Sequence, residues 1–184
     1  MLEQNTKMQE IMETVAGLMA LAARTAPKAK GKDFLEIKIL QGEVLQTLAD
    51  GMVEYAQKKG KDKKFFARDG ENVRRSEAVL LLSLNEPMPA GLNCGACGFD
   101  RCSDFNDQQP KKEGSEFAGP VCTWRQLDLG IALGSAAKTA SLHNADNRMM
   151  YTIGAVARAL KLIAGELVVG IPLSATGKSI YFDR

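Results

Sequence analysis

The stretch Leu92-Asn-Cys-Gly-Ala-Cys-Gly-Phe-Asp-Arg-Cys102 holds three of the four cysteines of this 184-residue chain. The fourth follows in the stretch Gly119-Pro-Val-Cys-Thr123. The four residues are Cys94, Cys97, Cys102 and Cys122, and their spacing is C-x2-C-x4-C-x19-C. Because no other cysteine occurs in the chain, this clustering indicates a shared chemical role.

Three chemistries compete for these thiols. Structural disulfides are typical of small, cysteine-dense secreted chains, and we expect this mid-sized chain to have no secretory signal. Zinc sites usually contain two C-x2-4-C pairs, and here only Cys94 and Cys97 form such a pair. Three close cysteines with one distant partner are typical of an iron–sulfur cluster. The spacing therefore favours a cluster over zinc, and zinc over thiols without a ligand.

Glycines accompany the cysteines. We expect Gly91, Gly95 and Gly98 to allow positive φ angles and a close approach of the backbone. Backbone N–H groups brought close in this way can donate hydrogen bonds to sulfur, which tunes the reduction potential of a cluster.

The segment Asn93-Cys-Gly-Ala-Cys-Gly-Phe99, with Cys102 and a later cysteine near a proline, resembles a known domain. This is the small 4Fe-4S domain of bacterial electron-transfer and corrinoid iron–sulfur proteins. The resemblance covers residues 91–123. It implies that Cys94, Cys97, Cys102 and Cys122 are the four ligands of one 4Fe-4S cluster.

Composition limits the class of protein. Hydrophobic residues make up 45% of the chain and charged residues 25%, which is ordinary for a globular protein. We therefore expect a single domain over residues 1–184, with a cluster-binding segment at 91–123 inside it. The net charge of +2 predicts no nucleic-acid partner. The absence of a long apolar run and of a signal peptide predicts no membrane partner and a cytoplasmic location.

Hydrophobic periodicity predicts the elements of an α+β fold. The apolar run 78–84 does not alternate, so we expect a central strand covered on both faces, with the cysteine loop directly after it. The helix 124–142 has so little polar surface that we expect it to be buried. Predicted helices are 3–25, 42–58, 124–142 and 155–162, and predicted strands are 34–40, 78–84, 149–153 and 166–173.

Four segments resemble the flavin-dependent nitroreductases. They are Ala22-Ala-Arg-Thr-Ala-Pro-Lys28, Asp128-Leu-Gly-Ile-Ala132, Met149–Gly154 and Val168-Val-Gly-Ile-Pro172. This resemblance implies a nitroreductase-like mixed sheet flanked by helices, with the cysteine-rich loop inserted after a central strand.

The same resemblance implies a cofactor and a partner. FMN is possible, and Arg24, Lys28 and Lys30 are the nearest cations for its phosphate. The nitroreductase family forms intertwined dimers, so we expect a homodimer. A methionine-rich stripe on the first helix could form a groove for varied partners, but core packing or a dimer seam is the simpler account of it.

Taken over most of its length, the chain resembles a family of uncharacterised prokaryotic proteins with a ferredoxin-type domain. The resemblance includes the ending Gly170-Ile-Pro-Leu-Ser-Ala-Thr-Gly-Lys-Ser-Ile-Tyr-Phe-Asp-Arg184. The sequence therefore predicts a 4Fe-4S protein for electron transfer, with an unknown redox partner, or for reduction of an unknown substrate. The alternative is a zinc-stabilised interaction module without redox activity.

Overall fold

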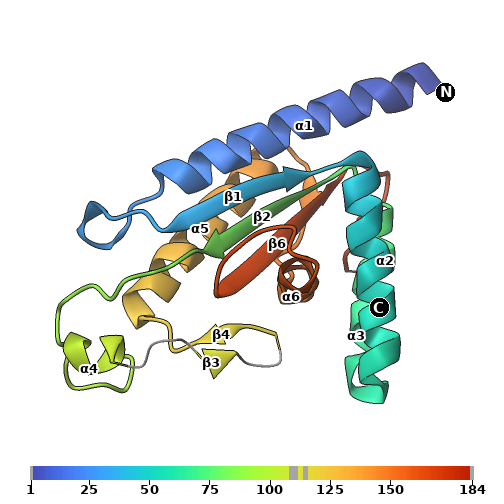
Figure 1. Ribbon diagram of the computed structural model, residues 1–184. Coiled ribbons are helices and arrows are strands. Elements are labelled where there is room, and N and C mark those ends of the chain that lie inside the picture. Colours follow the sequence, from blue (N-terminus) through green and yellow to red (C-terminus); the bar gives the residue numbers. More distant parts are fainter. Residues whose placement is uncertain (1, 108–111, 114–115, 183–184) are drawn as a thin grey trace.

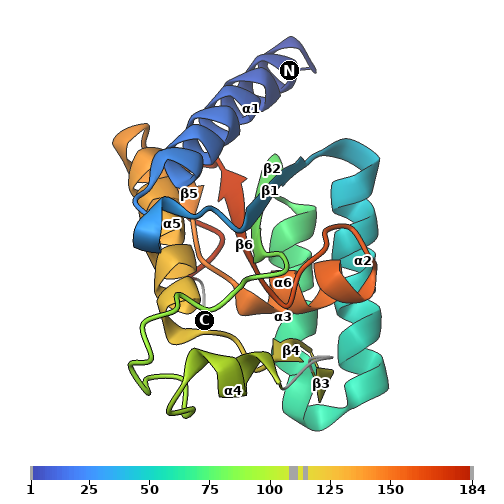
Figure 2. The ribbon, with the colours of Figure 1, turned by 60° about the vertical axis from the view of Figure 1, so that its left-hand side comes forward.

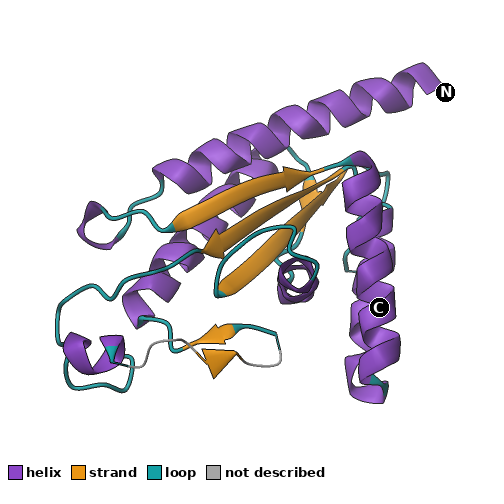
Figure 3. Cartoon of the chain, viewed as in Figure 1, coloured by secondary structure: helices purple, strands orange, loops and turns teal. Residues whose placement is uncertain are grey.

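A four-stranded sheet forms the centre of the computed structural model, which describes residues 2–107, 112–113 and 116–182 (Figure 1). The strand order is β1-β2-β6-β5, so β2 lies inside the sheet as expected. Helices cover both faces, and the α+β class is confirmed (Figure 3). The strands are β1 Leu35–Leu40, β2 Ala78–Leu84, β5 Asp146–Asn147 and β6 Leu167–Ser174.

The surroundings of strand β2 explain why apolar and polar residues do not alternate in its sequence. Every residue of the strand is buried. Leu80 and Leu82 pack into a core with helices α1 (Leu2–Thr25) and α5 (Thr123–Leu142). Val79 and Leu81 pack into a second core on the opposite face. Because helices cover both faces, alternate positions are equally apolar.

The first core confirms the apolar stripe predicted for the first helix. Met12, Val15 and Met19 of α1 are all at most 4% exposed and pack against the sheet. The methionine stripe therefore packs mainly in the core, which is one of the two simpler accounts of it. Figure 2 shows α1 and α5 together on one side of the sheet, with the N-terminal half of α1 projecting beyond it.

The second core contains a helix that the sequence did not reveal. Helices α2 (Gly42–Lys59), α3 (Lys64–Arg74) and α6 (Tyr151–Ala159) form the opposite layer. The predicted elements included no helix between residues 58 and 78. Instead a 3-10 turn leads into α3, which buries Phe66 and Val73. Charged residues surround Phe66 and Val73 in the sequence, so the apolar face of α3 was not recognised from the pattern of residues.

The strand predicted at 149–153 is wrong. Met150 makes one isolated bridge with Gly170, and helix α6 begins at Tyr151. A Cβ atom on Gly154 would clash with the backbone carbonyl of Val168. The glycine therefore lets the helix backbone rest directly on β6, and this tertiary contact overrides the local strand preference.

The sheet is also antiparallel at each described pairing, where we expected a mixed one. Between β1 and β2 the chain passes through two helices, α2 and α3, that pack against each other. An even number of helices returns the chain to the end of the sheet that it left. The next strand then runs in the opposite direction, with Leu40 opposite Val79.

Three short elements gather at one end of the molecule, below the sheet in Figures 1 and 2. They are α4 Cys102–Asn106, β3 Lys112–Glu113 and β4 Ala118–Gly119. The 3-10 turn Ala29–Gly31 lies to the side of the sheet, beside the start of α5. None of the described helices combines the length and the apolar character that crossing a membrane requires.

Candidate metal centre

The four cysteines lie on three segments that meet at this end of the molecule. Cys94 and Cys97 lie in the loop after β2, Cys102 is the first residue of α4, and Cys122 is the N-cap of α5. Cys94 is exposed, Cys97 and Cys102 are partly exposed, and Cys122 is buried. All four are free thiols.

The four thiols line one small cavity of about 10 Å³ together with the ring of Trp124. A cavity of this size holds roughly one water molecule. Within the described ranges, no three Cys, His, Asp or Glu side chains are placed to hold a metal ion. The thiols therefore share a cavity, and binding a metal group would require their sulfur atoms to turn further toward its centre.

The loop backbone has the conformation predicted from its glycines. Gly91, Gly95 and Gly98 have φ angles of 71°, 72° and 87°. Asn93 also has a positive φ of 47°, and its side-chain oxygen accepts a hydrogen bond from the backbone N–H of Cys102 at 2.8 Å. Asn93 thus fixes the start of α4 relative to the first cysteine of the loop.

A small apolar cluster supports the loop from below. Ala90, Phe105 and Cys122 are at most 5% exposed, and Phe99 packs against them. The rings of Phe99 and Phe105 meet edge to face, with centroids 5.7 Å apart. The loop therefore has its own packed base in addition to its link to the sheet.

The first turn of α5 makes two contacts with the cysteine loop. Thr123 Oγ1 donates a hydrogen bond to the carbonyl oxygen of Ala96 at 2.9 Å. Trp124 Nε1 donates to Cys94 Sγ at 3.3 Å. The pKa of the Cys94 thiol is lowered by the backbone hydrogen bond from Ala96 and then by the indole N–H of Trp124. Both donors favour the thiolate, which is the form that binds metals.

Arg125 joins three segments around the site, and we did not predict this role from the sequence. The side chain is 1% exposed. Its Nε donates to the carbonyl of Met88 at 2.9 Å, just before the cysteine loop. Its Nη1 donates at 2.9 Å to the carbonyl of Ala29 and to the Asp128 carboxylate. The signal in the sequence was an Arg–Asp pair at i, i+3 spacing in the first turns of a mostly apolar helix.

The three cations predicted to contact a flavin phosphate have different surroundings. Arg24 Nη1 pairs with Asp33 at 2.7 Å. Lys28 Nζ donates to three carbonyls at the end of α1, those of Ala23, Arg24 and Ala26. Lys30 has a φ of 57°, and its ammonium lies close to Gly91 at the start of the cysteine loop. The structure therefore places Lys30 beside Gly91, at the start of the cysteine loop, and ties Arg24 and Lys28 to the end of α1.

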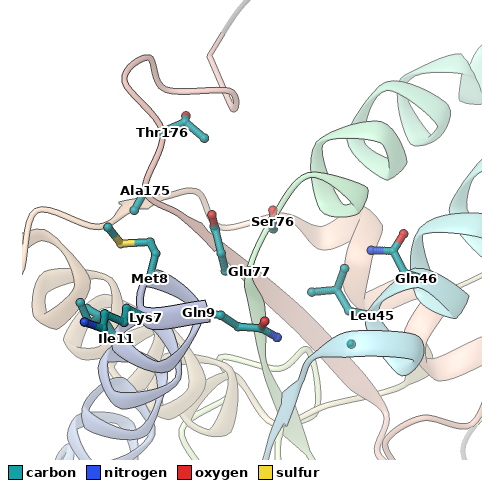
Figure 4. Close-up of a pocket in the computed structure, with 11 residues that line it drawn as sticks. Lys7, Met8, Gln9, Ile11, Leu45, Gln46, Ser76, Glu77, Ala175 and Thr176 are labelled. Carbon is teal, nitrogen blue, oxygen red and sulfur yellow. The ribbon is translucent and has the colours of Figure 1, made fainter. Parts of the chain in front are cut away.

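A much larger cavity, of about 690 Å³, lies at the opposite end of β2 from the cysteine loop (Figure 4). It is bounded by α1, the start of α2, the start of β2 and the chain after β6. Burial raises the pKa of the Glu77 carboxyl in this cavity. The lining residues labelled in Figure 4 are Lys7, Met8, Gln9, Ile11, Leu45, Gln46, Ser76, Glu77, Ala175 and Thr176.

Sequence comparison places the chain beside a protein from Archaeoglobus fulgidus described as "Uncharacterized protein". The two are 46% identical over 175 residues, covering 95% of this chain and 92% of that protein. A family model described as "Uncharacterized protein containing a ferredoxin domain" matches residues 118–184. That match contains Cys122 and begins after the other three cysteines.

Structure comparison finds nitroreductases. The nitroreductase CinD from Lactococcus lactis, in complex with nicotinic acid, has a TM-score of 0.53 at 16% identity, covering 93% of this chain and 84% of that one. The FMN-dependent nitroreductase NfnB from Mycobacterium smegmatis, in complex with NADPH, has a TM-score of 0.53 at 12% identity, covering 90% and 78%. At these identities the likeness shows the fold alone, and the predicted nitroreductase-like scaffold is confirmed.

Proposed function

The chain belongs to the family of uncharacterized proteins that contain a ferredoxin domain, and from this premise we propose that it binds one 4Fe-4S cluster and transfers electrons. The proposed ligands are Cys94, Cys97, Cys102 and Cys122. The observation that carries the proposal is that these four thiols, from three separate segments, line one cavity. Four thiolates are the usual ligand set of such a cluster.

The surroundings of the thiols support a negatively charged group. Cys122 caps the 20-residue helix α5, whose N-terminus carries a partial positive charge. The ammonium of Lys30 lies beside Gly91 at the edge of the loop. Both would offset the negative charge of four thiolates around a cluster.

The small size of the cavity means that the site would have to rearrange to bind a cluster. A cavity of about 10 Å³ is smaller than a cluster, so the side chains of Cys97 and Cys102, which are partly exposed, would have to turn to make room for it. The backbone of the loop, with positive φ angles at Gly91, Asn93, Gly95 and Gly98, would keep its contacts with Thr123 and Trp124. The buried Cys122 would stay in place on α5.

The exposure of the thiols supports a role in electron transfer. A bound cluster would accept and release single electrons. Cys94 is exposed, so a redox partner could approach this side of the site. Cys122 would hold the group from the buried side, next to the apolar base of the loop.

A zinc-stabilised interaction module is the second candidate function. The small size of the cavity favours it, because a single ion needs less space than a cluster. Cys94 and Cys97 also form the C-x2-C pair that zinc sites use. In that case the four thiolates would hold the loop in shape without redox activity.

Metal analysis separates the two candidates. The protein is purified without oxygen, and iron, acid-labile sulfide, zinc and flavin are measured per chain. A cluster predicts a brown protein with about four iron and four sulfide per chain. A colourless protein with about one zinc and no sulfide would establish the alternative instead.

A further inference from the structure

The indole of Trp124 makes a contact that cluster binding alone does not require. Its Nε1 lies 3.3 Å from Cys94 Sγ, within hydrogen-bonding distance of a sulfur acceptor. The ring is 39% exposed, so its N–H group could have been left to water. Instead the N–H group is directed at the thiol that is exposed to solvent.

The residues on either side of Trp124 hold the indole in this position. Thr123 Oγ1 is bonded to Ala96 O, between the first two cysteines. Arg125 is buried and bonded to Met88 O and Ala29 O. Since both neighbours of Trp124 are anchored to the segments around the cysteine loop, the first turn of α5 cannot rotate without breaking several hydrogen bonds.

We propose that Trp124 is a positioning residue that raises the reduction potential of the cluster by donating its indole N–H to the Cys94 thiolate. This inference rests on the proposed function. Reduction adds one electron to the cluster, and no bond breaks. The added electron increases the negative charge on the sulfur atoms, so a hydrogen-bond donor stabilises the reduced state more than the oxidised state.

The indole ring has a second effect on the same potential. It lines the cavity next to Cys94 and covers part of the exposed sulfur. Solvent exposure and hydrogen bonds to sulfur are both determinants of cluster potential. Replacing Trp124 by Phe would keep an aromatic ring over the site and remove the N–H group, so this substitution isolates the hydrogen bond.

The test is a redox titration of the reconstituted full-length protein with dithionite, comparing wild type with Trp124→Phe. We expect the variant to assemble a cluster and to have an equilibrium constant for reduction about tenfold lower, which corresponds to a midpoint about 59 mV more negative for one electron. A full cluster content with an unchanged midpoint would overturn the proposal.

Tyr151→Phe is the matched control. Tyr151 lies on α6 and is 41% exposed, close to the 39% of Trp124, and the substitution also removes one polar hydrogen from an aromatic side chain. We expect its midpoint to equal that of wild type. An equal shift in both variants would show that the change is not specific to the hydrogen bond, and would overturn the proposal.

A second measurement covers the case in which Trp124→Phe loses the cluster. Trp124 is the only tryptophan in the chain, so ¹⁵N-labelling of the indole marks this one N–H group. Magnetic resonance of the reduced, paramagnetic wild-type cluster should detect hyperfine coupling to that nitrogen and to an exchangeable proton. Absence of both couplings would overturn the proposal. If wild type itself contains no iron and sulfide, the proposed function fails, and this inference fails with it.

Discussion

Arg125 and Asp128 form a buried ion pair, with Nη1 and Oδ2 2.9 Å apart, at the point where α5 meets the loops before it. The other carboxylate oxygen of Asp128 accepts the backbone N–H of Ala29 at 2.7 Å. The pair therefore joins the turn after α1 to the helix that carries Cys122. Breaking it would affect both the stability of the fold and the base of the candidate site.

We predict that Asp128→Asn destabilises the protein by about 3–5 kcal/mol, because it leaves the Arg125 charge buried without its counter-charge. Urea unfolding followed by circular dichroism measures the change. The exposed pair Lys58–Glu54 is the control, and Glu54→Gln should change the unfolding free energy by less than about 0.5 kcal/mol. Equal, small effects of both substitutions would show that the buried pair does not hold these segments together.

Gly154 should be intolerant of a side chain. Its α6 backbone rests on the β6 carbonyl of Val168, so Gly154→Ala would force the helix away from the sheet. We expect a loss of about 2–4 kcal/mol in thermal or urea unfolding. Gly17 on α1 has open space around it, and Gly17→Ala should instead stabilise by about 0.5–1 kcal/mol. If both substitutions change the free energy of unfolding in the same direction, the proposed effect of the Gly154–Val168 contact is disproved.

We predict a homodimer. Three large apolar side chains on the outer face of α5, Trp124, Leu127 and Ile131, are 39–48% exposed, where we expected a buried helix. A Cβ atom added to Gly130 or Gly134 of this helix would meet nothing within 4 Å in the described part of the chain, so the protomer does not require their small size. A second copy packed on α5 would account for both observations.

Sedimentation at roughly 10 micromolar protein should therefore give twice the chain mass, which corresponds to a dissociation constant in the micromolar range or tighter. Ile131→Asp should convert the dimer to monomer. Val44→Asp, on α2 in the opposite helix layer and 45% exposed, should leave it intact. A monomeric wild type would exclude the dimer.

FMN binding stays a prediction. The internal bonds of Arg24 and Lys28 leave Lys30 as the most available of the three proposed cations. We expect titration with FMN to quench flavin fluorescence, and Lys30→Gln to weaken binding. No quenching up to roughly 100 micromolar, an affinity of only about −5.5 kcal/mol, would rule the flavin out.

Local patterns were enough to predict much of the fold. The unbroken apolar run of β2 predicted a strand covered on both faces, because such a run has no side left for solvent. The spacing of apolar residues likewise predicted α1 and α2 nearly to their ends. In these elements local preference and tertiary packing agree, so the sequence alone is informative.

The predictions were wrong where tertiary contacts, and not local sequence, determine the secondary structure. The segment at 149–153 has strand-like composition, and only the approach of Gly154 to Val168 shows why a helix forms there. Cysteine spacing predicted the candidate ligands, since it is a local signal. The contacts of Trp124 with Cys94 and of Arg125 with Met88 join residues about 30 positions or more apart, so no local pattern could predict them.

The central claim is that four cysteines together hold one 4Fe-4S cluster. Acid-labile sulfide measured after anaerobic reconstitution, in wild type and in the single Ala variants of Cys94, Cys97, Cys102 and Cys122, tests this claim most directly. We predict about four sulfide per chain in wild type and a severe loss in each variant, because each substitution removes one of four ligands. Full sulfide content in any folded variant would exclude that cysteine as a ligand, and wild type without sulfide would contradict the claim as a whole.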